Sequence, residues 1–297
     1  MTIRNHKLRA GIALGTAIAT PLATVQAQTQ NNEDYTVIRA EGGMSESKFT
    51  QAKIGNVDDD DATYARGLYG SVEILRSVNN GWDWSVSATS QDLGTIITQD
   101  DTESSILATV DTSFSSRSID FDLGKNFQRK NMDLRLSAGL TALQIEEQKG
   151  LGVLDGSDGS SLISNVNNKY LGFGGRLGMD AKLRLGENSP LSIFAGASTA
   201  ITHGDHDMRK GLSFYDVLDE NSTSSELTNI EVSQRMISSG NVNHTSANIG
   251  LELEAGNNTT FRIGVRHDKY SFKDGPTEIN GESISGNTAY VGVAIRF

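Results

Sequence analysis

The sequence has 297 residues, no cysteine and a formal net charge of −11. Without cysteine the chain can form no disulfide, no thiolate nucleophile and no cysteine-ligated metal site. Its acidic balance makes nucleic acid a poor partner, because the phosphate backbone is also negative. Hydrophobic residues make up 36% of the chain, which is low for a large packed core but too high for a disordered protein.

The amino-terminal residues have the pattern of a secretion signal. Residues 1–9 carry three basic side chains and no acid, residues 10–23 are a short apolar run, and Val25-Gln26-Ala27 fits a small-x-small cleavage site. The run is shorter than the roughly 20 apolar residues of a transmembrane helix. We therefore predict a signal peptide at 1–27, favoured over a buried helix, and a mature domain at 28–297 with a charge of −14 (−11 − 3).

Segments in which apolar and polar residues alternate recur through the rest of the chain. A period of two is typical of a strand with one apolar face. The pattern predicts ten strands, near residues 34–44, 64–77, 81–91, 116–127, 131–145, 169–185, 190–204, 244–255, 259–272 and 287–297.

The connections between these strands alternate between tight and long. Tight turns fall at 79–81, 128–130, 186–189 and 256–258, and long polar connections at 45–63, 92–115, 146–168, 205–243 and 273–286. Short turns at one end and long loops at the other are typical of an outer-membrane barrel, whereas a soluble sandwich has long loops at both ends. We predict an all-β protein with one antiparallel transmembrane barrel of about ten strands, short periplasmic turns and long extracellular loops.

The two faces of the predicted strands differ in the way that a membrane barrel requires. In 169–185, Leu171, Phe173 and Leu177 share one face, while charged residues share the other. The apolar face is expected to contact lipid and the charged face to line the lumen. The predicted lumen charges are Arg176, Asp180, Lys182, Arg184, Glu252, Glu254, Arg262, Arg266 and Arg296.

The turn at 256–258 also predicts a register. It places Leu253 opposite Phe261 and Glu252 opposite Arg262, so that apolar meets apolar and acid meets base. Replacing Glu252 with leucine is then expected to leave Arg262 unpaired in the lumen and to destabilise the barrel by several kcal/mol. Near another turn, Trp82 and Trp84 share an apolar face and are expected to belong to an interfacial aromatic girdle, with core packing in a sandwich as the alternative.

Two segments resemble known membrane barrels. The stretch KYLGFGGRLGMDAKLRLGENSPLSIFAGASTAITHG at 169–204 is similar to a hairpin of the Legionella-type pore-forming major outer membrane protein family, with Phe173, Gly174, Arg176, Gly178 and Asp180 as the matching residues. This resemblance implies a pore or a structural membrane role and carries over no catalytic residue.

The ending AYVGVAIRF resembles the terminal signature of outer-membrane proteins. The resemblance implies that the barrel-assembly machinery recognises Val291, Val293, Ile295 and Phe297 in the last strand.

One cluster suggests catalysis. His203, Asp205, His206 and Asp207 follow one another closely at 203–207, and an Asp–His pair can activate water or help to bind a metal. The arrangement resembles the rim of omptin proteases, yet the surrounding residues do not match. Polar rim residues are the favoured interpretation, so we expect no enzyme. The acid run at 58–61 lacks the spacing of a calcium loop, and we expect no metal or cofactor.

Whether the lumen conducts is left open by the sequence. Charges of both signs on the lumen face could form ion pairs in a narrow barrel, and about sixteen strands are needed for a wide channel. We therefore predict a small pore or a structural barrel in the outer membrane, with a surface-adhesion barrel and a rim protease as alternatives. Expected partners are outer-membrane lipid, lipopolysaccharide, the assembly machinery and small solutes or ions.

Overall fold

The computed structural model describes residues 35–49, 62–64, 66–101, 106–155, 161–186, 189–216, 228–273 and 283–297. The predicted signal peptide at 1–27 and the acid run at 58–61 lie outside these ranges. Within them, no helix has the length and apolar character needed to cross a membrane.

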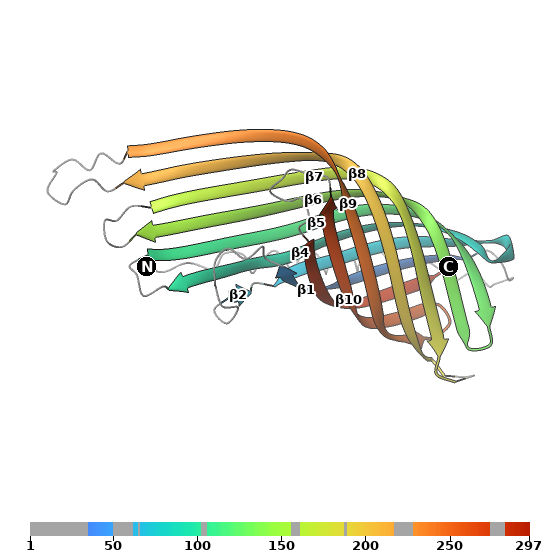
Figure 1. The fold of residues 1–297 in the computed structure, drawn as a ribbon. Coiled ribbons are helices and arrows are strands. Elements are labelled where there is room, and N and C mark those ends of the chain that lie inside the picture. Colours follow the sequence, from blue (N-terminus) through green and yellow to red (C-terminus); the bar gives the residue numbers. More distant parts are fainter. Residues whose placement is uncertain are drawn as a thin grey trace.

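Eleven strands form one antiparallel sheet. β2 has three residues and pairs only with β4, while β4 also pairs with β5 and closes the sheet on itself (Figure 1). The closed ring therefore has ten strands (eleven minus β2). The bounds are β1 (Thr36–Phe49), β2 (Ala62–Tyr64), β3 (Gly67–Val78), β4 (Trp82–Asp101), β5 (Ile106–Arg129), β6 (Met132–Asp155), β7 (Ser161–Arg184), β8 (Leu191–Asp216), β9 (Thr228–Ala255), β10 (Thr259–Lys273) and β11 (Ser283–Arg296).

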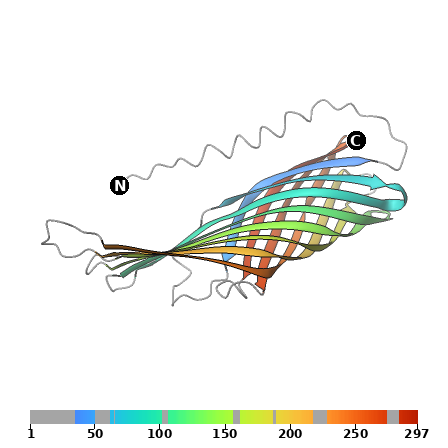
Figure 2. The same cartoon turned by 90° about the horizontal axis from the view of Figure 1, so that it is seen from above.

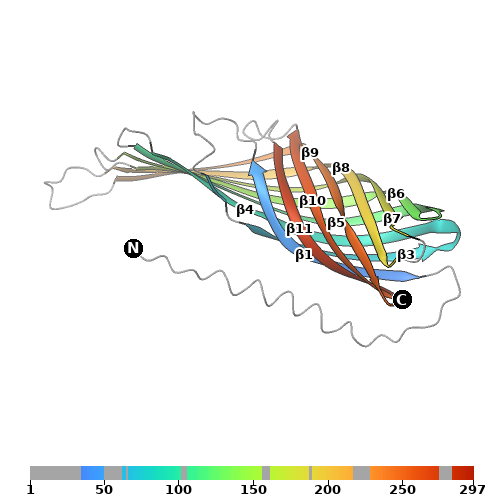
Figure 3. The same cartoon turned by 90° about the horizontal axis from the view of Figure 1, so that it is seen from below.

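The first and last strands of the ring join each other directly. β1 and β11 lie side by side in Figure 3 and pair along their whole length. At the end of this seam, the N–H of Thr36 donates to the carbonyl of Phe297 at 3.1 Å, and the N–H of Phe297 donates back at 2.8 Å. A closed sheet leaves no exposed edge in lipid, where an unpaired backbone group costs several kcal/mol. The predicted barrel is confirmed.

The register predicted around the last tight turn is also confirmed. Leu253 lies opposite Phe261, and Glu252 lies opposite Arg262. Gly256 opens the turn with φ of +74°, a conformation that is strained for residues with a Cβ. The other predicted turns are present, at Asn79–Gly81, at 130–131 and between Arg184 and Leu191.

The predicted long connections are mostly wrong. Of the five, 92–115, 146–168 and 205–243 consist largely of strand, because β4 to β9 have 20 to 28 residues each. The apolar face ends inside these strands, but the backbone ladder continues. Outside the bilayer a strand needs no lipid-facing apolar row, so hydrophobic alternation stops before the strand does.

These long strands raise one side of the barrel into a projecting sheet. β9 pairs with β10 only as far as Asn241 opposite Lys273, and beyond that point residues Thr228–Gly240 pair with β8 alone. In Figure 1 the ends of β4 to β9 leave the barrel as an open sheet, which Figure 2 shows nearly edge-on. We call this part of β4 to β9 the extension.

The outer wall of the barrel is apolar. Leu140, Phe173 and Val291 are 66%, 65% and 61% exposed, and similar side chains surround the ring. An apolar band of this size would be an aggregation hazard in water, but it suits contact with lipid.

Candidate functional site

The half of the lumen next to the short turns, which we call the charged half, is lined by ion pairs. Arg135 lies 2.7 Å from Asp83 and 3.6 Å from Asp180. Arg176 forms an ion pair with Asp122 and lies 3.8 Å from Asp120. Successive side chains of a strand point to opposite faces of the sheet, so these side chains point into the lumen while the residues before and after each of them point to lipid.

A second set of charges in this half forms a chain. Lys182 contacts Glu252 at 2.5 Å and Glu254 at 2.9 Å. Glu252 also contacts Arg262 at 3.0 Å, and Arg262 reaches Glu41 at 3.1 Å. Each of the two central residues, Glu252 and Arg262, therefore has two partners of opposite charge, which reduces the penalty for placing it away from bulk water.

The ion pairs of the charged half follow the wall. Arg135–Asp83, Arg176–Asp122 and Lys182–Glu252 each join strands that have one strand between them in the ring. Several side chains here remain open to water, since Asp180, Arg184 and Glu254 are 58%, 43% and 42% exposed. Arg296 lies at the mouth, with its guanidinium 3.9 Å from the centre of the Tyr35 ring. The charged half therefore keeps contact with water, although Tyr69, Phe194 and Tyr290 form a small buried cluster inside it.

Further from the short turns, side chains meet across the lumen. Asp268 on β10 is fully buried and contacts Arg266 at 2.7 Å and His244 at 2.9 Å. Gln91 on β4 donates to Asp268 at 3.2 Å, and it accepts a hydrogen bond from Tyr270 at 3.1 Å. β4 and β10 are far apart in the ring order, so these bonds span the interior.

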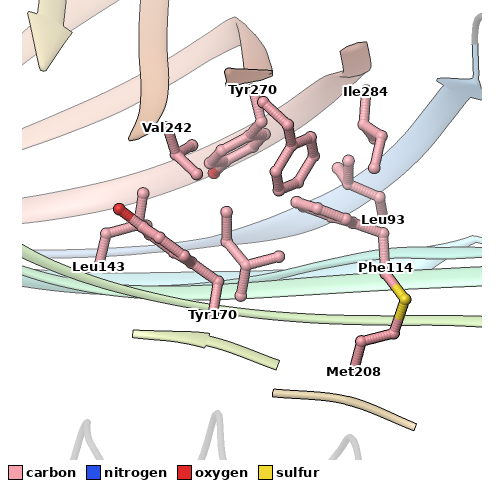
Figure 4. Packing of buried hydrophobic residues seen from close by; sticks show 10 residues of the cluster. Leu93, Phe114, Leu143, Tyr170, Met208, Val242, Tyr270 and Ile284 are labelled. Atoms are coloured by element: carbon pink, nitrogen blue, oxygen red, sulfur yellow. The ribbon is translucent and has the colours of Figure 1, made fainter. Parts of the chain in front are cut away.

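An apolar cluster fills the lumen at this level, and we call it the plug (Figure 4). The Tyr270 ring lies 5.0 Å from the Phe114 ring between opposite strands, and its hydroxyl lies 2.8 Å from that of Ser116. The His206 ring lies between those of Tyr170, at 4.7 Å, and Phe272, at 6.1 Å. The members of the plug are Leu93, Phe114, Leu143, Ile145, Tyr170, Met208, Val242, Tyr270, Phe272 and Ile284, each at most 2% exposed.

The structure places all nine predicted lumen charges on the inner side of the wall, but the plug was missed by sequence reasoning. A signal was present, because Tyr170 and Tyr270 share strand parity with the lumen charges Arg176 and Arg266. Aromatic residues on a lumen face have no lipid to contact, so they must pack against one another. The sequence does not show how far along each strand they meet.

The candidate catalytic cluster is divided between two faces of β8. His206 points inward into the plug, whereas His203, Asp205 and Asp207 point outward. His203 bonds to Asn241 at 3.0 Å. The Asp205–His206 pair of the alternative rim protease is therefore not formed, because β8 continues straight through a segment that we expected to be a loop.

Outside the bilayer, Asp207 lies on the extension and accepts two hydrogen bonds from Arg235 on β9, at 2.8 and 2.9 Å. These bonds lower the pKa of Asp207 below its usual value, and the charges of Arg235 and Arg209 add to the effect.

The two tryptophans lie on the outer wall. Trp82 is 52% exposed, and Lys125 lies 5.0 Å from its ring centre. Val291, Val293 and Ile295 share the outward parity of β11, and Phe297 forms the backbone bonds to Thr36 described above.

Comparisons with known proteins identify the type of barrel. The family described as Legionella pneumophila major outer membrane protein precursor matches residues 75–239. No curated protein sequence matches the chain.

Among solved structures, Neisserial surface protein A is 10% identical with a TM-score of 0.35, covering 88% of this chain and 97% of its own. The outer membrane protease OmpT from Escherichia coli is 11% identical with a TM-score of 0.41, at 92% and 99% coverage. A major outer membrane protein from Thermus thermophilus is 10% identical with a TM-score of 0.37, at 90% and 100% coverage.

Proposed function

The chain belongs to the Legionella pneumophila major outer membrane protein family and is an outer-membrane β-barrel, and we propose that it acts as a structural barrel with a closed lumen. The observation that carries this proposal is the contact between opposite walls, where Tyr270 on β10 meets Phe114 and Ser116 on β5. Conduction requires a continuous aqueous path, and apolar side chains packed across a lumen exclude water.

A small pore is the alternative that the charged half favours. Its lumen face carries charges of both signs, and several of them are exposed to water, which suits passage of small ions. For ions to pass, Tyr270 and Phe114 would have to separate, and Gln91 would have to leave Asp268. The described arrangement therefore corresponds to the closed state of any such pore.

Bilayer conductance tests the proposal. Refolded wild-type barrel in a planar bilayer is expected to give no sustained current above the lipid background. A stable ohmic current at low voltage would overturn the closed-lumen function and favour the small pore. Insertion is checked independently by protection of the refolded barrel from protease in the same lipid.

A second candidate function is surface interaction through the extension. The inner face of this sheet exposes Leu212, Phe214 and Val232 at 42%, 38% and 55%, and one edge of Thr228–Gly240 has no strand partner among the described residues. Exposed apolar side chains beside an open edge suit contact with another protein. Replacing Val232 with lysine is expected to weaken attachment of the cells to host surfaces, whereas unchanged attachment would remove this candidate.

Two further assignments concern export and assembly. We propose that residues 1–27 form a cleaved signal peptide and that Val291, Val293, Ile295 and Phe297 are recognised by the barrel-assembly machinery. The exposed outward face of β11 and the bonds that join it to β1 support the second assignment. Replacing Phe297 with serine is expected to lower the amount of barrel in the outer membrane, and an unchanged amount would contradict it.

A further inference from the structure

We propose that the outer wall holds one lipopolysaccharide molecule, with an acyl chain in a groove across β8 to β1 and a phosphate beside Arg66 and Lys269. The proposal goes beyond the closed-lumen function and depends only on placement in the outer membrane. Figure 3 shows this side of the wall, where β1, β11, β10, β9 and β8 follow one another.

The groove has a volume of about 810 Å³ and follows two neighbouring rows of outward residues; between these rows the lining also includes Ser45, Asn248, Arg266 and Thr288, whose side chains have the inward parity. The first row is apolar and consists of Ala195, Ile249, Val265, Ala289 and Met44, each facing the next across the sheet. Small side chains at Ala195 and Ala289 leave space between the larger ones.

The second row begins with Ala247 on β9 and then becomes polar. It continues through His267, Asn287 and Glu46, and Arg66 follows, directly before the first residue of β3. His267 and Asn287 are joined by a hydrogen bond at 2.8 Å. A polar row directly beside an apolar row on the lipid-facing wall marks the boundary between headgroups and hydrocarbon.

The groove slopes into the bilayer. Counted from the short-turn end of each strand, its apolar row lies four residues along β8 at Ala195 but eight residues along β1 at Met44. Strands of such barrels tilt by about 35–45°, so the β8 end lies deeper. A lipid with its headgroup at Arg66 would therefore direct an acyl chain toward Ala247 and Ala195.

The charge above the groove selects the headgroup. Arg66 and His267 line it, Lys269 lies two residues further along the outward face of β10, and Lys273 lies beyond; among the described residues that line the groove, Glu46 is the one acid. This concentration of basic residues stands out in a chain with a net charge of −11. Basic residues at a membrane surface attract anionic lipid headgroups.

The side of the membrane selects the lipid. Short turns of outer-membrane barrels face the periplasm, so the polar end of the groove faces the outer leaflet. Lipopolysaccharide, a phosphorylated and multiply acylated glycolipid, occupies that leaflet. Its lipid A part supplies both chemical features of the site, namely phosphates for Arg66 and Lys269 and acyl chains for the alanine-lined floor.

Native mass spectrometry of the purified full-length barrel in detergent tests the site, with diphosphoryl lipid A as the probe and phosphatidylglycerol as the phospholipid comparison. We expect one lipid A per barrel, bound at least about tenfold more tightly than phosphatidylglycerol. Ala247→Trp fills the groove and is expected to weaken binding about tenfold or more. The matched control is Ala138→Trp, which also adds a ring to the lipid-facing wall, but on β6.

A headgroup variant gives an independent check, because exposed side chains can be changed without repacking the wall. Arg66→Gln with Lys269→Gln is expected to weaken binding of diphosphoryl lipid A, which has two phosphates, more than binding of phosphatidylglycerol, which has one, and so to remove the preference. Equal lipid A binding by wild type and Ala247→Trp would overturn the proposal. So would equal affinity for the two lipids, or a wild-type dimer that becomes monomeric in Ala247→Trp, which would assign the groove to a second copy of the chain.

Discussion

The charged half of the lumen and the plug belong to the same ten-stranded barrel, yet their side chains interact in opposite ways. In the charged half, Arg135, Arg176 and Lys182 reach partners nearby along the wall, so these ion pairs do not cross the lumen. At the level of the plug, Tyr270 and the neighbouring Gln91 reach partners on distant strands, so the centre is filled. Because both regions lie in one ring of strands, the difference between them comes from the partners that their side chains choose.

The difference has a physical basis in the side chains. Charged groups keep some contact with water and can follow the wall as ion pairs, whereas aromatic and aliphatic groups gain free energy by leaving water and meeting each other. A lumen with acids and bases near one end and Tyr, Phe and Leu near the other is therefore wet at the first end and closed at the second.

The strongest way to break the comparison is to empty the plug. Tyr270→Ala removes the ring that contacts Phe114 and the hydroxyl that bonds Ser116 and Gln91. Loss of a buried aromatic side chain costs about 3–5 kcal/mol. We expect that loss in the free energy of unfolding in lipid vesicles, together with a new ionic current in planar bilayers.

Phe173→Ala is the control for that experiment, because Phe173 is 65% exposed on the lipid-facing wall. It is expected to lower stability less and to add no current. A silent Tyr270→Ala barrel that still inserts would show that Tyr270 does not close the lumen.

The second change concerns the charged half. Arg135→Met leaves the fully buried carboxylate of Asp83 without its 2.7 Å partner, although Asn126 still donates to it at 2.5 Å. Removing one member of a buried ion pair costs about 3–5 kcal/mol. Urea unfolding should show this loss. Bilayer conductance should not change, because Arg135 and Asp83 pair along the wall and do not cross the lumen.

An exposed pair provides the matched comparison. Arg184 lies 3.6 Å from Asp133 and is 43% exposed, so Arg184→Met is expected to cost at most about 1 kcal/mol. Equal losses in the two methionine variants would mean that the Asp83 site is not buried from water.

A third change corrects the expectation drawn from the register alone. Glu252→Leu does not isolate Arg262, because Arg262 keeps Glu41 at 3.1 Å and Lys182 keeps Glu254 at 2.9 Å. We expect a loss of about 1–2 kcal/mol instead of several. Adding Glu41→Leu should cost clearly more than the sum of the two single variants, and strict additivity would show that the two acids do not share Arg262.

The smallest effect is expected on the extension, where Arg235 lowers the pKa of Asp207. A depressed carboxyl pKa contributes stability above the unfolded value, and this contribution is lost as pH falls through the lower folded value. The protection factors of the backbone amides in β8 and β9 against hydrogen exchange, which are corrected for the intrinsic effect of pH, should therefore fall slightly on acidification. Arg235→Gln should remove this dependence of protection on pH. Arg209 lies further from Asp207, at 3.8 Å, so Arg209→Gln should largely preserve it.

The sequence predicted the barrel because two signals in it are local. Strand alternation and tight turns place Leu253 opposite Phe261 and Glu252 opposite Arg262 without knowledge of the rest of the chain. The extension was missed because strand without a lipid-facing apolar row, as at Asp205 and Asp207, has the composition of a loop. The plug was missed because the meeting of Phe114 with Tyr270 depends on ring order and strand stagger, which no local pattern contains.

Thiol labelling of a single introduced cysteine tests the central claim most directly, since the natural chain has none. Ser198 lies on the inner face of β8, between the charged half and the buried residues Ala200 and Thr202. A closed plug above a charged half that keeps contact with water predicts that a charged, membrane-impermeant maleimide labels Ser198→Cys from the periplasmic side but not from outside intact cells. Rapid labelling from outside intact cells would contradict the account.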